Sequence, residues 1–340
     1  MQPLRKRRGG LTLLWLGAAL AAAVIVSLAL GRYPISPCEA GGILLSKALP
    51  IPSFWSARTE AVLMNVRLPR VLLACMVGCC LSAAGTAYQG VFQNPMASPD
   101  ILGASAGAGF GAALAIWLGA GSRIITLGAF ACSLLTIALV WLVGSGAKNR
   151  RLLGLILSGI MVGSLCQAGT SLIKLAADPT NQLPAITYWL MGSLSGARLQ
   201  DAGFAALPMA LGLAPMLLLR WRLNLLTLGD DEAAAMGVNA GALRLVYTLC
   251  ATLVTAASVS VSGTIGWVGL VIPHLSRWLV GDDNRILLPA AMLFGALFLL
   301  AVDMAARTLL TMEIPIGILT ALIGAPVFLY LIIRGGGEAA

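Results

Sequence analysis

The sequence predicts an all-α polytopic membrane protein with about ten transmembrane helices. Of its 340 residues, 59% are hydrophobic and only 10% are charged, whereas a soluble domain carries roughly 25% charged residues. At ~20 residues per span plus short loops, the chain has room for about nine to eleven helices. The apolar runs are continuous, whereas the strands of a membrane barrel would alternate with period two.

The apolar runs divide the chain into successive predicted spans. These lie at about 11–30, 69–92, 102–119, 124–145, 152–175, 201–219, 243–262, 264–280, 286–306 and 314–333. The segments at 32–66 and 176–199 are predicted as external, the first with short helical pieces. We therefore expect one transmembrane domain over residues 1–340, with no soluble domain.

Basic residues set the predicted orientation. The run Arg5-Lys-Arg-Arg8 precedes the first span, and Lys148, Arg150 and Arg151 mark a short loop. Cytoplasmic loops collect Lys and Arg, so both termini are predicted in the cytoplasm. The first apolar run is long and further spans follow, which favours an uncleaved span over a signal peptide. The net charge of +9 then reflects topology in a lipid membrane, and no nucleic-acid partner is expected.

The long predicted cytoplasmic loop at about 220–243 contains the densest acidic cluster. Asp230 suits a helix cap, and Asp231 and Glu232 then lie in the first turn, where carboxylates suit the helix dipole. Strong helix formers and a stopping glycine follow: Ala233, Ala234, Ala235, Met236 and Gly237. About two helical turns are far short of the ~12–15 residues that an isolated helix needs in water. We predict that another protein docks on this element.

The loop Asn94-Pro95-Met96 lies where the second and third predicted spans meet the cytoplasm. Pro95 and Pro99 stiffen this loop, because proline fixes φ and cannot continue a helix. Two interpretations remain open, a rigid turn and an inner gate.

Three glycines, Gly103, Gly107 and Gly111, repeat every four residues in the third predicted span. They form a small-residue face on which helices can touch backbone to backbone. Packing within the chain, the lining of a pathway and a dimer seam are all compatible with this pattern.

Three arginines lie at the predicted outer face. Arg67 and Arg70 flank Leu68-Pro69, and Arg307 follows Asp303 by four residues. Pro69 fits the first position of a helix, which would place Arg70 at the unfavourable positive end of the dipole. Headgroup anchoring or an external acidic partner would explain these arginines, and an i,i+4 pair with Asp303 would explain Arg307 locally.

Catalytic and metal-binding patterns are scarce. The ionisable residues lie near the ends of the predicted spans, so neither a proton relay nor a catalytic dyad is expected in mid-membrane. No Gly-x-x-x-x-Gly-Lys-Ser/Thr phosphate loop occurs. His274 is the only histidine, and no Cys/His spacing suggests a metal site. The chain is not expected to be an enzyme, and energy for transport would have to come from another protein.

Five stretches together resemble the permease subunits of ABC importers for iron–siderophore, haem and vitamin B12. They are Arg67-Leu-Pro-Arg70; Gln89 through Asn94-Pro-Met-Ala97 to Gly103-Ala-Ser-Ala-Gly107; Leu228-Gly-Asp-Asp-Glu-Ala-Ala-Ala-Met-Gly237; Gly263-Thr-Ile-Gly-Trp-Val-Gly-Leu-Val-Ile-Pro-His-Leu-Ser-Arg277; and Asp303 to Arg307 with Pro315-Ile-Gly317 and Gly324-Ala-Pro326. They follow the family's order over most of residues 67–328. Residues 1–66 and 120–200 match mainly in hydropathy.

The resemblance implies a multi-pass permease of the cytoplasmic membrane that works as a homodimer, with the pathway along the dimer axis. It implies two cytoplasmic ATPase subunits, which hold ATP and Mg, and an extracytoplasmic substrate-binding protein. No cofactor is expected in this chain itself. The residues implied in coupling to the ATPase are Gly229, Asp230, Asp231, Glu232, Ala233, Ala234, Met236 and Gly237.

The resemblance also assigns roles at the two faces. Arginines matching Arg67, Arg70 and Arg307 meet acidic residues of the binding protein in such families, and the loop matching Asn94 and Met96 belongs to the cytoplasmic gate. Met96 stands where leucine is commoner, which leaves that assignment intact. ATP binding would close the partner subunits and tilt the helices through the docking loop, giving alternating access.

The expected cargo is a bulky metal chelate. A ferric siderophore is favoured because that class is the largest in the family, with haem and vitamin B12 or another corrinoid as alternatives. A different class, an ion-coupled secondary transporter, would be indicated by transport that survives ATP depletion and collapses with the ion gradient. An intramembrane enzyme would need a catalytic pair at depth, which the sequence does not provide.

Overall fold

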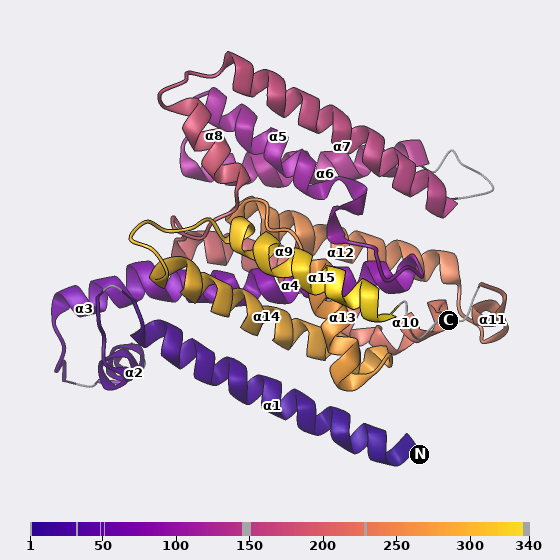
Figure 1. Ribbon diagram of the computed structural model, residues 1–340, viewed down its shortest axis with the longest axis horizontal. Helices are drawn as coiled ribbons and strands as arrows, with labels where there is room; N and C mark the ends of the chain where they lie inside the picture. Colours follow the sequence, from indigo (N-terminus) through magenta and orange to yellow (C-terminus); the bar gives the residue numbers. More distant parts are fainter. Residues whose placement is uncertain are drawn as a thin grey trace.

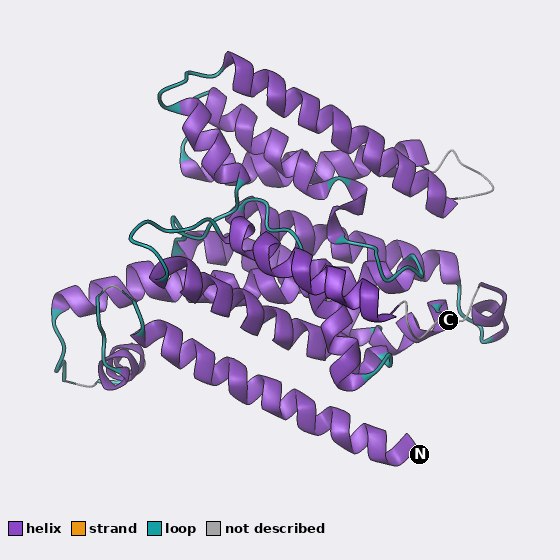
Figure 2. Cartoon of the chain, viewed as in Figure 1, coloured by secondary structure: helices purple, strands orange, loops and turns teal. Residues whose placement is uncertain are grey.

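The computed structural model describes residues 2–31, 33–47, 49–50, 52–144, 151–227 and 230–335, and these residues form helices and loops without strands (Figures 1 and 2). The helices that match the predicted spans are α1 (Gln2–Ala29), α4 (Leu68–Val91), α5 (Ala104–Trp117), α6 (Ser122–Gly144), α7 (Arg151–Ala176), α9 (Leu199–Leu218), α12 (Ala240–Ser262), α13 (Val268–Val280), α14 (Asn284–Thr308) and α15 (Ile316–Gly335). The predicted all-α class is confirmed for the described chain.

Shorter helices occupy the predicted loops. They are α2 (Pro37–Ser46), α3 (Ala57–Val62), the π-helical turn η1 (Leu63–Arg67), the 3₁₀ turn η2 (Pro99–Leu102), α8 (Gln182–Leu190), α10 (Arg220–Leu226) and α11 (Asp230–Ala235). Within the described ranges, seven helical segments are long and apolar enough to cross a membrane, and three shorter apolar helices accompany them at 104–117, 268–280 and 316–331. The chain is therefore a polytopic helical membrane protein.

The helices form two layers along one long axis. In Figure 1, α5, α6, α7 and α8 make the upper layer, while α4, α9 and α12 to α15 make the body below it, with α1 along the lower edge. The helix α12 joins the layers, since it packs on α4 and α9 and also on α5 and α6. The start of α1, the end of α15 and α11 all lie at the same end of the long axis (Figure 1).

The helix α4 is the centre of the body, and most of its residues are buried. Glycines let its backbone touch its neighbours. A Cβ added at Gly78 would lie 2.2 Å from the carbonyl oxygen of Gly295 in α14, and one at Gly85 would lie 1.8 Å from that of Gly269 in α13. Small residues at helix crossings permit such close approach in membrane proteins.

The second span is preceded by a helical turn that the sequence did not predict. The sequence places a helix start at Pro69, but the helical backbone runs without a break from Ala57 to Val91. The intervening η1 is a π-helical turn, closed by a bond from the Leu68 N–H to the Leu63 carbonyl. Proline has no N–H to donate to the preceding turn, and a wide π-helical turn before Pro69 lets the helix continue without that hydrogen bond. Pro69 therefore lies in the first turn of α4, as predicted, but a further helical segment precedes it.

We expect Gly85→Ala to destabilise the protein, because the new methyl group would overlap the Gly269 carbonyl. Overpacking of this kind costs about 1–3 kcal/mol. Gly203→Ala in α9 is the matched control, since a Cβ there meets no atom within 4 Å and alanine favours the helix by about 0.5–1 kcal/mol. Unfolding of the purified protein by SDS would measure both. Equal stability of the two variants would contradict the packing described for α4.

Candidate functional site

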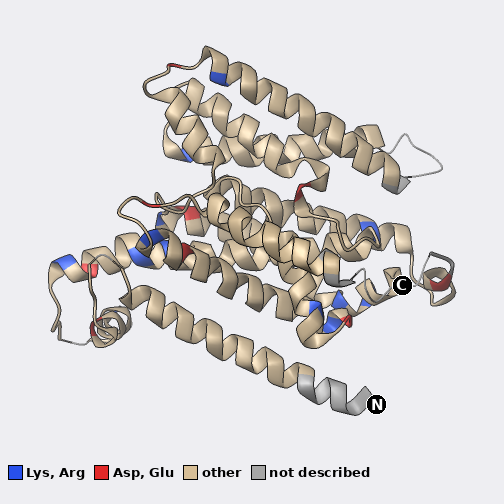
Figure 3. Cartoon of the chain, in the orientation of Figure 1, with Lys and Arg blue, Asp and Glu red and all other residues tan. Residues whose placement is uncertain are grey.

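Charged residues gather towards the two ends of the long axis, with few between them (Figure 3). At one end, Arg70 and Arg307 share the fully buried carboxylate of Asp303. Arg70 Nε lies 2.6 Å from Asp303 Oδ1, and Arg307 Nε lies 3.1 Å from Asp303 Oδ2. The predicted i,i+4 pair of Asp303 and Arg307 is thus confirmed. Arg70 Nη1 also lies 2.8 Å from Glu313 Oε2, in the loop between α14 and α15.

The same cluster ties α1 to the body. Arg307 Nη2 donates to Ser27 Oγ at 2.7 Å. Arg67 donates through Nη1 to the carbonyls of Leu28 at 2.5 Å and Ala29 at 2.8 Å, and through Nη2 to the Tyr33 carbonyl. The end of α1 is therefore fixed by two guanidinium groups.

The three predicted docking arginines are brought together but turned inward. Arg67 and Arg70 are each 4% exposed, and Arg307 is 9% exposed. In this conformation their partners are within the chain. Contact with an external acidic protein stays a prediction, and it would require these groups to exchange their present partners.

We expect Asp303→Ala to lower the stability strongly, because it would leave two buried guanidinium groups without their shared carboxylate. Breaking a buried ion pair on one side costs about 3–5 kcal/mol. Glu313→Gln is the comparison, since Glu313 is one-third exposed and water can replace its contact; a much smaller loss is expected. SDS unfolding would measure both. A loss for Asp303→Ala no larger than that for Glu313→Gln would contradict a structural role for the cluster.

The predicted gate loop lies at the opposite end of α4. The Asn94 N–H donates to the Gln89 carbonyl at 3.2 Å, and the Met96 N–H donates to Asn94 Oδ1 at 2.9 Å. This is a turn closed by an asparagine side chain. Asn94, Pro95 and Met96 are exposed. The loop is a stiff turn in this structure, and its role as a gate stays a prediction.

The gate loop and the coupling loop are connected through α10. Gln93 has a φ of 48°, and its amide donates to the carbonyl of Leu226 in α10. Leu223 of α10 is buried, and a Cβ at Gly90 of α4 would lie 2.8 Å from its Cδ1. Sequence reasoning missed this connection, because neither Gln93 nor α10 carries a recognisable motif.

The helix α10 also anchors the next turn. Asn224 Nδ2 donates to Asp283 Oδ1 at 2.7 Å, and Asn224 Oδ1 accepts from the Asn284 N–H at 2.9 Å. Asp283 in turn caps α14 by accepting from the Arg285 N–H at 3.0 Å. One amide therefore ties α10 to the start of α14.

The predicted coupling helix is present as α11. Ala233 is buried, whereas Glu232 and Ala234 are exposed and Met236 is 50% exposed. Gly237 has a φ of 75°, and its N–H donates to the Ala234 carbonyl at 2.9 Å. The predicted glycine stop is confirmed.

Part of the predicted coupling set is not described. Gly229 lies outside the described residues, and only the backbone is described for Asp230 and Asp231. The described remainder presents one acidic and one apolar side chain outward on a short helix, as a docking element would.

The glycine face of α5 lies against the other helices of its layer. A Cβ at Gly107 would lie 2.2 Å from Thr136 Oγ1, and one at Gly111 would lie 2.3 Å from the Gly128 carbonyl oxygen, both in α6. Gly103 has a φ of 75° and faces the backbone of α7 at Gly159 and Gly163. These glycines serve packing within the chain in this structure.

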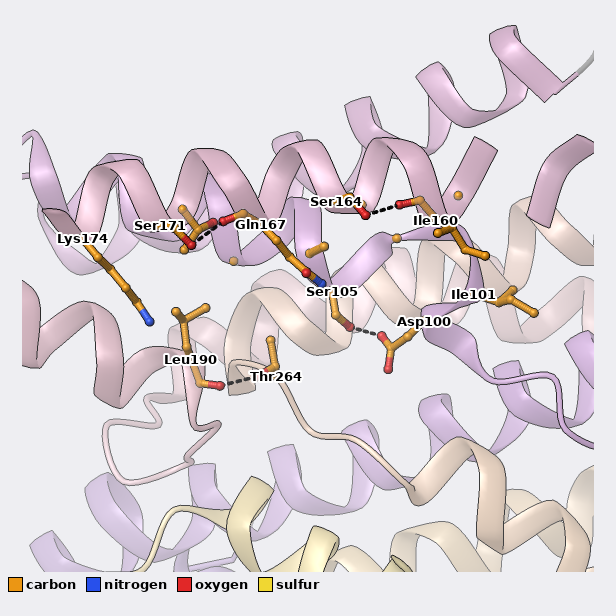
Figure 4. A pocket seen from close by; sticks show the side chains of 16 residues that line it. Asp100, Ile101, Ser105, Ile160, Ser164, Gln167, Ser171, Lys174, Leu190 and Thr264 are labelled. Atoms are coloured by element: carbon orange, nitrogen blue, oxygen red, sulfur yellow. Dashed lines mark hydrogen bonds between the residues drawn. The ribbon is translucent and has the colours of Figure 1, made fainter. Parts of the chain in front are cut away.

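A pocket of about 710 Å³ lies between α5 and α7 and was not anticipated from the sequence (Figure 4). Polar side chains line it on both helices and at its ends: Asp100, Ser105, Ser164, Gln167, Thr170, Ser171, Lys174 and Thr264. Four of them, at 164, 167, 171 and 174, follow helical spacing on α7. That pattern was available in the sequence, but serines in an apolar run are a weak signal.

Asp100 is the acidic group of this pocket. It lies in η2, and Ser105 Oγ donates to its Oδ1. Its side chain is exposed and opens to the pocket.

The described residues contain no group of three His, Cys, Asp or Glu side chains that could hold a metal ion. The fold defines the chain as a multi-pass helical membrane protein. Residues 19–334 match the FecCD transport family, and the chain belongs to that family.

Relatives across the family match most of the chain, from 84% to 96% of it. The molybdate import system permease protein MolB of Haemophilus influenzae is 42% identical, over 96% of each protein. The hemin transport system permease protein HmuU of Yersinia pestis is 40% identical, over 84% of this chain and 89% of that protein. The cobalamin import system permease protein BtuC of Halobacterium salinarum is 36% identical, over 93% of this chain and 94% of that protein.

A solved structure described as an inward-facing metal-chelate type ABC transporter has the same fold. Its TM-score is 0.84 at 39% identity, and the match covers 95% of this chain and 98% of that one. The resemblance drawn from the five sequence stretches is thus confirmed. The chain is a permease subunit of an ABC importer and a multi-pass protein of the inner membrane.

Proposed function

We propose that the chain crosses the membrane with ten helices and keeps both termini in the cytoplasm. The number of described helices that match the predicted spans supports this topology. An even number of crossings returns the chain to its starting side, and the start of α1 and the end of α15 do lie at the same end of the structure (Figure 1). The basic N-terminal run Arg5-Lys-Arg-Arg8 favours the cytoplasm for that end.

The permease works as a homodimer that binds two cytoplasmic ATPase subunits and receives cargo from an extracytoplasmic binding protein. ATP and Mg belong to the ATPase partner, and this chain holds no cofactor of its own. The scarcity of charged groups between the two ends of the helices supports an external source of energy. Uptake occurs by alternating access, with the pocket between α5 and α7 on the route of the cargo.

The observation that carries the proposal is the exposed surface of α11. A helix of six residues is too short to be stable alone, yet it presents Glu232 to the cytoplasm, and the turn that follows it presents Met236. Movement of α11 would pass to α10, which adjoins it and packs against α4. From α10 it would reach the Asn94 loop through the bond between Gln93 and the Leu226 carbonyl.

The favoured cargo is a ferric chelate, carried across as a bulky complex, with haem and a corrinoid as alternatives supported by relatives of those names. Molybdate is a second candidate, because a molybdate permease is 42% identical over nearly the full length. ATP-dependent uptake of each labelled cargo by the complete importer in proteoliposomes distinguishes them.

We expect the double variant Glu232→Arg, Met236→Asp to abolish stimulated ATP hydrolysis and uptake in the complex reconstituted with its ATPase and binding protein. The two changes reverse the charge and remove the apolar contact on α11. The few hot-spot residues that dominate an interface each cost about 2 kcal/mol or more when they are truncated. ATP hydrolysis and co-purification of the ATPase are the measurements.

Met312→Asp is the matched control, since Met312 is 72% exposed in the loop at the opposite end of the chain. This variant should assemble and hydrolyse ATP like the wild type. Unchanged hydrolysis and uptake in the α11 double variant would show that α11 is an ordinary connector, and the proposed coupling would be lost.

A further inference from the structure

We infer that a second pocket, which we call the α6–α9 pocket, binds a zwitterionic phospholipid whose headgroup carries a primary ammonium group. Asp201 meets the ammonium group, and Arg123 at the rim meets the phosphate. The inference concerns the lipid around the permease and depends on neither the cargo nor the ATPase.

The α6–α9 pocket lies where several helices end at the same side of the protein. Its volume is about 500 Å³, within the ~300–1,000 Å³ that is usual for small-molecule sites. The ends of α5, α8 and α12, the start of α6, the loop 193–197 and Asp201 in the first turn of α9 form its walls. Tyr188 and Trp189 of α8 line it, and Tyr and Trp are enriched at the headgroup level of membranes. The pocket is therefore placed at the depth of a lipid headgroup.

The hydroxyl groups in its walls offer acceptors to a ligand. Ser260 Oγ and Ser262 Oγ donate to backbone carbonyls of α12 at 2.9 and 2.8 Å. Thr126 Oγ1 donates to a carbonyl of α6 at 3.2 Å, and Ser193 Oγ donates to Ser195 Oγ at 3.1 Å. A hydroxyl has a single proton, so these four donating groups have only lone pairs left for a ligand.

Asp201 is the charged side chain among the residues that line the α6–α9 pocket. It is half-buried, and its Oδ2 accepts from the Arg198 N–H at 3.0 Å. Among the described residues, no Lys or Arg side chain forms a salt bridge with it. A carboxylate among acceptors calls for a cation that brings several N–H donors. A primary ammonium group brings three, and its bond to a carboxylate is charge-assisted.

Two arginines lie beside the lining residues, at the rim of the pocket. Arg123 follows the lining residue Ser122 and donates through Nη2 to Gln200 Oε1 at 2.5 Å, which joins α6 to α9. Arg198 lies three residues before Asp201. Both arginines are exposed, and neither forms a salt bridge with a carboxylate of the described chain. Guanidinium groups suit phosphate, so the rim and the wall together match both charges of a zwitterionic headgroup.

The same two helices provide an apolar surface deeper in the membrane. The rings of Phe130 in α6 and Phe204 in α9 meet edge to face, with their centroids 5.7 Å apart. At ~1.5 Å per residue, these rings lie about 8–12 Å along their helices from the helix starts. Leu127 and Leu207, each three residues from one of the rings, are exposed. Acyl chains would gain from burial on this surface, whereas a water-soluble amine would not, which favours a phospholipid as the occupant.

The test is lipid binding to the full-length permease, stripped of lipid in detergent and measured by native mass spectrometry. The probes are phosphatidylethanolamine and phosphatidylcholine with the same acyl chains; the second has the same charges but a quaternary ammonium group without N–H. We expect the wild type to bind phosphatidylethanolamine at least about tenfold more tightly, the factor expected of a hydrogen bond to a charged group. Asp201→Asn should remove this preference, because the amide keeps the helix cap and loses the charge. Arg123→Gln should weaken the binding of both lipids and keep the preference.

Asp178→Asn is the matched control. Asp178 is an exposed carboxylate in the loop before α8 that likewise accepts from backbone N–H groups, and it does not line the pocket. This variant should keep the wild-type preference. Equal binding of the two lipids by the wild type, an unchanged preference in Asp201→Asn, or no binding of either lipid would overturn the inference. Glycerophosphoethanolamine, which is the same headgroup without acyl chains, should not displace the lipid at equal concentration; displacement would show a water-soluble occupant and overturn the assignment to lipid.

Discussion

The close approach of α4 to its neighbours is the contact on which the rest of the structure depends. Gly78 and Gly85 let this helix touch the backbones of α14 and α13, so the body of the protein is set by main-chain contacts. Lipid offers no hydrophobic drive for helices to associate, and small residues replace it with van der Waals packing. Because α4 is rigidly held, groups at its two ends keep a fixed separation.

The two ends of α4 serve different purposes. Arg70 at one end joins α14 and the following loop through Asp303 and Glu313. At the other end, Gly90 packs on Leu223 of α10, and Gln93 bonds to the same short helix. A displacement of α10 would therefore be resisted by α4 and directed into the loop of Asn94.

The fold was predictable from the sequence because hydropathy and helix signals are local. Each predicted span corresponds to a described helix, and the stop at Gly237 follows from its positive φ. The helix start beside Pro69 was predicted, but the π-helical turn that joins it to the preceding helix was not, because local rules favour a new helix at a proline. A proline changes the backbone hydrogen bonding of a helix but does not always end the helix.

The sites were less predictable because their partners are distant in the sequence. The pair of Asp303 and Arg307 spans four residues and could be seen, whereas Arg70 reaches Asp303 across 233 positions and could not. Likewise, the polar stripe from Ser164 to Lys174 gains meaning only when α5 closes a pocket over it. Sequence reasoning found which residues are unusual, and tertiary structure decided what they face.

One fold in this family serves relatives named for molybdate, hemin and cobalamin, so cargo preference must reside where side chains can differ without disturbing the helices. The glycine positions of α4 cannot set cargo preference, because any larger side chain there would collide with a carbonyl group. The buried cluster around Asp303 cannot set cargo preference either, because its buried charges must stay balanced. The exposed positions Ser164, Gln167 and Ser171 on α7 have no such constraint. Selectivity within the membrane is therefore expected to lie on the wall of the pocket, where a change of one polar group alters the match to cargo and leaves the packing intact.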